Sequence, residues 1–228
     1  MAQSADVPTV LPKRPGKIIA VHVAYESRAK ERGRRPKAPT YFLKAPSSVT
    51  GTGADLVRPK GTRLMAFEAE IALVIGKPAY RVPLAEAWDH VAFVTAANDL
   101  GIYDYRPQDK GSNIRSKSRD GYTPLGPRLI DAREVSPDKL RVRAWLNGEL
   151  VQDDTTAVEA LIFPLPQFVA DLSQHFTSRR GGRDPYRNPD GLHGDHPRGH
   201  ARNRGGCPGA RAELGHIDQL RGRRRGRL

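Results

Sequence analysis

The sequence has a single cysteine, Cys207, and no run of apolar residues long enough to span a lipid bilayer. One thiol cannot form a disulfide within the chain, so a disulfide-stabilised fold is excluded and a reducing, cytoplasmic compartment is expected. A transmembrane helix needs roughly 20 consecutive apolar residues, and an export signal needs a continuous apolar segment near the N-terminus. Because neither pattern is present, we expect neither export nor membrane association.

Lysine is missing from residues 178–228, although this segment contains 13 Arg, 11 Gly and 5 acidic residues. The segment therefore carries +8 of the formal net charge of +13, which leaves little net charge on the remainder. It has almost no apolar periodicity, so it cannot bury enough surface to offset the conformational entropy lost on folding. We expect a flexible arm at 1–16, one catalytic domain at 17–177 and a disordered tail at 178–228.

The tail also suggests two functions other than catalysis. The run RGRRRGR gives nonspecific affinity for phosphate, but no aromatic interleaving or recognised nucleic-acid-binding fold accompanies it. Nucleic acid is therefore expected only as a nonspecific partner, and deletion of the tail would abolish a salt-dependent affinity for DNA. A zinc cluster is the second alternative, although its spacing does not match a standard finger. Its candidate ligands are His193, His196, His200 and Cys207.

Strand patterns dominate the part of the chain before the tail. Runs of β-branched and apolar residues predict strands, and the alternation around Asn147-Gly148 predicts a hairpin over 140–156. Helices are predicted at 83–91 and 164–176. This order of elements predicts an α+β fold with a mixed, largely antiparallel sheet. The predicted single strands are 17–25, 40–49, 64–77 and 91–99.

Two carboxylates, Glu68 and Glu70, alternate at the head of the apolar run FEAEIALVIGK. Residues two apart on a strand point to the same face and lie about 6.5–7 Å apart. Both faces of the run are apolar beyond Glu70, which predicts a strand that is buried on both sides. Two acids at the mouth of such a strand are costly to desolvate unless a cation joins them.

A third acid, Asp99, closes the predicted strand 91–99. Taken alone, an Asp at a strand end is more often a turn residue than a ligand. Together with Glu68 and Glu70, it offers three oxygen ligands from two strand ends, which suits Mg²⁺ or Mn²⁺. Zinc is disfavoured at this place because no His or Cys lies beside these acids.

Five segments between residues 17 and 177 carry a resemblance to a known family. They are LMAFEAEIALVIGK, AAND, RSKSRDGYTPLGP, LNGELVQDDTT and IFPLPQFVADLSQHFT. In this order and spacing they resemble the fumarylacetoacetate hydrolase family, and within it the 2-hydroxyhepta-2,4-diene-1,7-dioate isomerases of homoprotocatechuate degradation.

The resemblance implies a mixed β-sandwich roll, usually dimeric, that binds one Mg²⁺ or Mn²⁺. The implied metal ligands are Glu68, Glu70 and Asp99, and the implied active-site lysine is Lys117. Such a lysine beside a metal-bound oxo acid would polarise a carbonyl or activate water. The implied partner is a small 2-oxo or 2-hydroxy-dienoic acid.

Several positions bear on the reaction and the substrate. The first strand of the family commonly leads into Asn-Tyr and then a His that acts as acid and base, where this chain has Ala24-Tyr25 and Arg28. Glu31 matches the usual partner of that His and is the second catalytic candidate. The loss of the His favours isomerase or decarboxylase over hydrolase, and hydrolysis of an acylpyruvate-type C–C bond remains the alternative. The expected substrate-binding residues are Tyr25, Lys44 and Arg106, the last through a distal carboxylate.

The family continues beyond the second helix with an apolar strand and a Thr-Gly-Thr-Pro loop, which this sequence lacks. For one choice of codons for Gly182–Gly191, a one-base shift reads DVILTGTPT, the expected segment. We therefore expect the C-terminal strands to be missing and residues from about 178 onward to be a frameshift product. A chain with this tail would have poor stability and little activity, and resequencing of the locus tests the shift.

Overall fold

The computed structural model describes residues 9–176, 190–194, 212–213 and 217–219. The flexible arm expected at 1–16 lies partly outside these residues, as do most of the tail and the candidate zinc ligands His196, His200 and Cys207. Within the described residues, no helix has the length and apolar character needed to cross a membrane.

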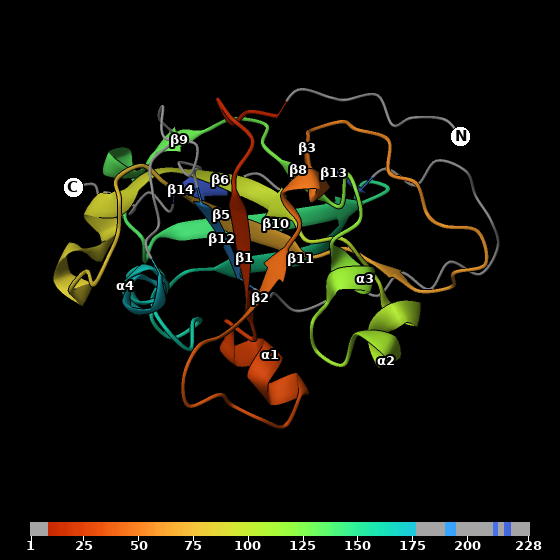
Figure 1. Cartoon of the computed structure of the whole chain (residues 1–228), viewed down its shortest axis with the longest axis horizontal. Helices are drawn as coiled ribbons and strands as arrows, with labels where there is room; N and C mark the ends of the chain where they lie inside the picture. The colour runs from red at the N-terminus through yellow and green to blue at the C-terminus, as the bar shows by residue number, and fades with distance from the viewer. Residues whose placement is uncertain (1–8, 177–189, 195–211, 214–216, 220–228) are drawn as a thin grey trace, which may run out of the picture.

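The largest sheet has eight strands in the order β2-β1-β12-β5-β6-β8-β3, with β9 paired to β6 (Figure 1). The pairs β1–β12 and β3–β8 are parallel and the other pairs are antiparallel. The expectation of an α+β fold with a mixed, largely antiparallel sheet is therefore confirmed. The strands are β1 (Lys17–His22), β2 (Thr40–Lys44), β3 (Val49–Gly51), β5 (Ala69–Ile75), β6 (Val91–Asn98), β8 (Thr123–Leu125), β9 (Ile130–Asp131) and β12 (Asp190–Gly194).

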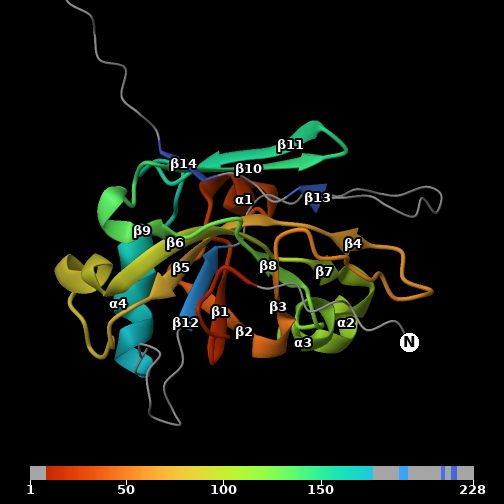
Figure 2. The same ribbon diagram turned by 90° about the horizontal axis from the view of Figure 1, so that it is seen from above.

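A second sheet lies over the first and contains the predicted hairpin (Figure 2). Asn147 and Gly148, with φ of 53° and 84°, form the turn, as expected for a two-residue hairpin loop that needs positive φ at both positions. The hairpin strands β10 (Leu140–Leu146) and β11 (Glu149–Thr155) are joined by β13 (Ala212–Glu213) and β14 (Ile217–Gln219), which both pair with β10. A separate short pair is formed by β4 (Met65–Ala66) and β7 (Gly101–Ile102).

The helices are short except for the last. The helix predicted at 164–176 is confirmed as α4 (Leu165–His175), whereas the one predicted at 83–91 is a 3₁₀ helix over Leu84–His90. The other α-helices are α1 (Glu26–Glu31), α2 (Arg106–Asp109) and α3 (Ile114–Lys117). Further 3₁₀ turns are Pro46–Ser48, Tyr103–Tyr105 and Ala132–Glu134.

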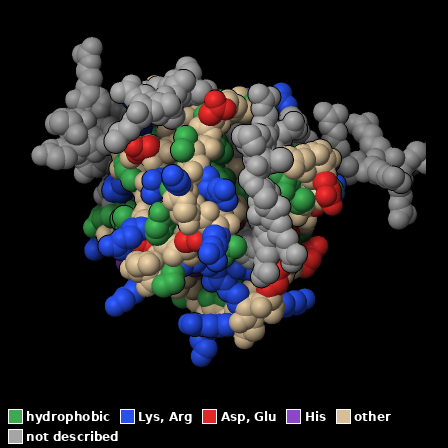
Figure 3. Space-filling model, turned by 90° about the vertical axis from the view of Figure 1, so that its right-hand side faces the viewer, with side chains coloured by type: hydrophobic (Ala, Val, Ile, Leu, Met, Phe, Trp, Pro, Cys, Tyr) green, Lys and Arg blue, Asp and Glu red, His purple; other side chains and the backbone are tan. Residues whose placement is uncertain are grey.

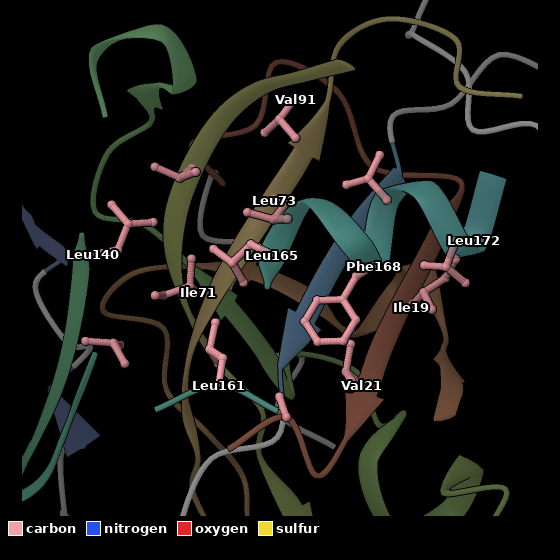
Figure 4. Close-up of a cluster of buried hydrophobic side chains, with 14 of the residues drawn as sticks. Ile19, Val21, Ile71, Leu73, Val91, Leu140, Leu161, Leu165, Phe168 and Leu172 are labelled. Atoms are coloured by element: carbon pink, nitrogen blue, oxygen red, sulfur yellow. The ribbon is translucent and has the colours of Figure 1, made fainter. Parts of the chain in front are cut away.

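The main core lies on one face of the large sheet, beneath α4 and the hairpin (Figure 4). Phe168 of α4 packs in this core with Val21 of β1 and Leu73 of β5. Ala72 and Val74 belong to a second apolar cluster on the other face. Strand β5 is thus buried on both faces, as the apolar run predicted, and its N-terminal end lies deep in the molecule.

In the described part of the chain after residue 177 there are three strands, although the sequence analysis expected the C-terminal strands to be missing. Strand β12 fills the position between β1 and β5, pairing Leu192 with Ile19 on one side and Leu73 on the other. The physical reason is that a strand edge offers backbone N–H and C=O groups that any extended segment satisfies, whatever its side chains.

Candidate active site

Two candidate ligands meet where β5 begins and β6 ends. The backbone N–H of Asp99 donates to the carbonyl oxygen of Glu68 at 2.8 Å, and the N–H of Glu68 donates to Asn98 Oδ1 at 3.2 Å. The single strand predicted over 64–77 is interrupted. Strand β4 ends at Ala66 and β5 begins at Ala69, so Glu68 lies in the break between them. The side-chain bond from Asn98 explains the break, because it takes a backbone donor out of the regular ladder.

Two lysines join the buried carboxylates. Lys117 Nζ lies 2.6 Å from Glu68 Oε2 and also donates to Asp99 Oδ2. Lys44 Nζ, at the end of β2, donates to Asp99 Oδ1 and, at 3.0 Å, to the carbonyl oxygen of Tyr122. All four of these ionisable side chains are at most 3% exposed. Burial lowers the pKa of Lys44, an effect that the charge of Asp99 opposes.

The position of Lys117 is set by the α2–α3 segment. The buried carboxylate of Asp109 accepts bonds from the backbone N–H of Arg115 at 2.9 Å, from the N–H of Ser116 at 2.8 Å and from Ser116 Oγ at 2.6 Å. Gly101 leaves room for the lysine stem, since a Cβ there would lie 3.3 Å from Lys117 Cγ. The lysine is therefore oriented by its helix and by the absence of a side chain opposite it.

A tyrosine that the sequence analysis did not select contacts Glu68 directly. The hydroxyl of Tyr103 donates to Glu68 Oε1, and the guanidinium of Arg106 lies 3.8 Å from the centroid of the Tyr103 ring. This stacking is a cation–π contact, and it connects Arg106 to the carboxylate cluster through one side chain. The signal in the sequence was an aromatic residue four positions after Asp99.

The remaining predicted residues are placed differently. Glu70 lies in β5 and is 1% exposed. Burial raises the pKa of Tyr25, and the charges of Glu70 and Asp154 raise it further, which places this tyrosine within electrostatic reach of both acids. Glu31 is half exposed at the end of α1 and pairs with Arg28. The structure thus joins Lys44, Glu68, Asp99 and Lys117 directly, with Arg106 attached through Tyr103.

The three predicted metal ligands have the oxygen donors of a divalent-cation site. Glu68, Glu70 and Asp99 are 0%, 1% and 2% exposed, and their oxygens are the donors that Mg²⁺ and Mn²⁺ prefer. Among the described residues, no group of three or more His, Cys, Asp or Glu side chains is arranged to hold a metal ion. The ammonium of Lys117 instead contacts both Glu68 and Asp99. The three acids fit such a cation in donor type, charge and burial. In this structure the ammonium of Lys117 links Glu68 to Asp99.

The chain that carries this fold and this cluster matches a known family. The fumarylacetoacetate (FAA) hydrolase C-terminal family matches residues 17–182, which include all the side chains of the cluster. The chain belongs to this family. The resemblance seen in the sequence is thereby confirmed, and the family is one of enzymes.

Curated relatives differ in how much of their length this chain matches. It is 41% identical over 179 residues to the 4-hydroxyphenylacetate degradation bifunctional isomerase/decarboxylase of Salmonella dublin, covering 78% of this chain and 41% of the relative. The chain thus spans about two fifths of the bifunctional relatives that it matches. An uncharacterized protein of Pyrococcus horikoshii is 31% identical over 190 residues, which cover 80% of this chain and 82% of that protein.

Solved structures agree with the fold. The 2-hydroxyhepta-2,4-diene-1,7-dioate isomerase from Mycobacterium marinum superposes with a TM-score of 0.69 at 26% identity, covering 84% of this chain and 67% of that one. The fumarylpyruvate hydrolase of Pseudomonas aeruginosa, solved with Mn²⁺ and pyruvate, has a TM-score of 0.73 at 24% identity. That match covers 95% of this chain and 93% of the hydrolase. At this sequence identity it shows a shared fold and nothing about function.

Proposed function

We propose that the chain is a divalent-metal-dependent enzyme that acts on 2-oxo or 2-hydroxy-dienoic dicarboxylic acids of aromatic catabolism, by isomerisation or decarboxylation. The observation that carries the proposal is the buried contact of Lys117 with both Glu68 and Asp99. Ionised groups are rarely buried together unless they serve a site, because their desolvation is costly. The names of the relatives, which are isomerases and decarboxylases, support the same class of substrate.

The charges of the cluster support both a cation and an anionic ligand. Glu68 and Asp99 contact the ammonium groups of Lys44 and Lys117, and Glu70 is a third buried carboxylate in β5, so these five side chains total one negative charge when all are ionised. A divalent cation changes this total to one positive charge. The carboxylate of a 2-oxo acid then neutralises the site, which favours binding of cation and substrate together.

The residues that would hold Mg²⁺ or Mn²⁺ are Glu68, Glu70 and Asp99. When bound, such an ion stabilises the enolate of a 2-oxo acid as a Lewis acid. Lys117 provides an ammonium donor beside that position and holds a proton at the substrate oxygen. Lys44 donates to Asp99 and places a positive charge beside this buried carboxylate. Burial raises the pKa of Tyr25 above its usual value, so its hydroxyl stays protonated and would donate a hydrogen bond to the substrate.

A dicarboxylic substrate needs a second cationic contact, which we assign to Arg106. Its guanidinium stacks on Tyr103 and is thus held next to the cluster without being part of it. Exposed basic residues such as Lys110 and Arg115 lie in the same segment, and Lys and Arg side chains gather on this face of the molecule (Figure 3). Such a surface raises the local concentration of an anionic substrate.

Isomerisation is favoured over hydrolysis by the residue that faces Glu31. In hydrolases of the family a His at this place activates water, whereas here Arg28 pairs with Glu31. A guanidinium remains protonated in proteins and cannot take a proton from water. The pair therefore lacks the base that a hydrolase uses. Acylpyruvate-type C–C hydrolysis remains the second candidate, because the family to which the chain belongs is named for a hydrolase.

The test is an assay of the purified chain on a 2-hydroxy-diene-dioate and an acylpyruvate, with Mg²⁺, Mn²⁺ or a chelator. Because β12 occupies the position between β1 and β5 that the sequence analysis expected to be empty, we expect metal-dependent turnover of the dienedioate and its loss in Asp99→Asn. Turnover of the acylpyruvate alone would favour the hydrolase. Turnover that persists in chelator and in Asp99→Asn would contradict the metal-dependent mechanism.

A further inference from the structure

The side chain of Gln152 makes two hydrogen bonds to the backbone of one residue, Ala69. Gln152 Nε2 donates to the carbonyl oxygen of Ala69 at 2.9 Å, and the N–H of Ala69 donates to Gln152 Oε1 at 2.9 Å. Gln152 is 5% exposed and Ala69 is 3% exposed. The amide thus pairs with the first residue of β5 as the backbone of a neighbouring strand would.

The place of this contact is what connects it to the site. Ala69 lies between Glu68 and Glu70, and its two peptide groups link it to the α-carbons that carry those side chains. Strand β12 pairs with β5 at Leu73 and Val74, several residues away from Ala69. On the side of β5 opposite β6, Gln152 satisfies the two backbone groups of Ala69, whose burial without a partner would be costly.

The hairpin is built to present this side chain inward. Gln152 pairs with Ala144, and the register of β10 and β11 shifts between Ala144 and Trp145, which is a β-bulge. Bulges re-aim side chains and are frequent beside active sites. The next residue, Asp153, points outward and pairs with Arg141, so the alternation of β11 directs Gln152 to the interior.

We propose that Gln152 is a positioning residue that fixes the orientation of Glu68 and Glu70 toward a divalent cation. This inference rests on the metal site of the proposed function. A shift of the Ala69 backbone moves the carboxylates of Glu68 and Glu70 together, because these two residues are its direct neighbours in the chain. Gln152 therefore acts on the cation through the backbone, and the hairpin supplies the second layer of the site without supplying a ligand.

The experiment compares Mn²⁺ binding to the wild type, Gln152→Met and Gln152→Asn, by titration and by the EPR spectrum of the bound ion. Gln152→Met keeps the length of the side chain and removes both hydrogen bonds, and Gln152→Asn keeps the amide on a shorter stem. We expect the Kd for Mn²⁺ to rise by about 10- to 100-fold in the Met variant, the range seen for partners of metal ligands. A smaller rise is expected in the Asn variant, which also serves if the Met variant does not fold.

The control is Gln174→Met on α4, which removes hydrogen bonds to Val82 and Ala170 outside the site. We expect it to lower the Tm without changing the Kd or the EPR spectrum. Unchanged Mn²⁺ binding in folded Gln152 variants, with only a lower Tm, would overturn the positioning role. Glu70→Gln is measured alongside: if it binds Mn²⁺ like the wild type, or if the wild type binds none, the proposed metal site fails and this inference with it.

Discussion

The ammonium of Lys117 and the carboxylate of Glu68 form a buried ion pair, with Nζ 2.6 Å from Oε2 and both side chains at most 1% exposed. Lys117 also reaches Asp99, so one cation serves two acids from different strand ends. Removing one partner of a buried pair leaves an uncompensated charge in the interior. Lys117 therefore offsets the negative charge of these two buried acids before any ligand binds.

Replacement of Lys117 tests this balance. We expect Lys117→Met to reduce the free energy of unfolding by about 3–5 kcal/mol, because Glu68 loses its buried cation. Turnover should be lost, while Mn²⁺ should bind at least as tightly since a competing positive charge is gone. Urea denaturation and a metal titration measure the two effects. Weaker metal binding in the folded variant would show that the lysine supports the ion and does not compete with it.

Tyr103→Phe isolates the hydroxyl that donates to Glu68. A hydrogen bond to a charged group contributes about 1.5–3 kcal/mol, so we expect the stability to fall by that amount while Arg106 still stacks on the ring. Tyr80→Phe is the matched control, because Tyr80 is 56% exposed and also has an Arg over its ring, at 5.2 Å. If both substitutions lowered the free energy of unfolding in denaturant by the same amount, the hydrogen bond from Tyr103 to Glu68 would not contribute to stability.

Arg106→Lys tests recognition of the second carboxylate. Lysine keeps the charge but loses the planar guanidinium that stacks on Tyr103 and binds a carboxylate in two places. We expect the KM for a dicarboxylate substrate to rise about tenfold, from the loss of roughly 1.4 kcal/mol, with little effect on a monocarboxylate analogue. Arg133→Lys, at an exposed arginine paired with Asp131, is the control. Equal changes for both substrates would remove Arg106 from the distal site.

Asp109→Asn tests how α3 is held. Burial alone would raise the pKa of Asp109, but hydrogen bonds from Ser116 and from the backbone of Arg115 and Ser116 lower it below 3.8. Its contribution is therefore present above the unfolded pKa and lost as the pH falls through the folded value. We expect the variant to be about 1–3 kcal/mol less stable at pH 7, and the difference to shrink below pH 4. A difference in stability between wild type and variant that does not change with pH would show that the Asp109 carboxylate is not its cause.

The sequence predicted the parts of the site that have local signals. Turn residues marked the hairpin at Asn147-Gly148, and unusual acids in apolar runs marked Glu68, Glu70 and Asp99. It did not predict the break before Ala69, because that break depends on the side chain of Asn98 from another strand. Gln152 and Tyr103 were missed for the same reason, since their partners are distant in sequence and only the fold brings them together.

The central claim is that Glu68, Glu70 and Asp99 bind one divalent cation in the buried cluster. The most direct measurement is the stoichiometry and affinity of Mn²⁺ for the wild type and for Glu70→Gln, with circular dichroism to verify folding. We expect one Mn²⁺ per wild-type chain, displaced by excess Mg²⁺, and a loss of binding in the folded variant. Equal binding by both proteins would contradict the account.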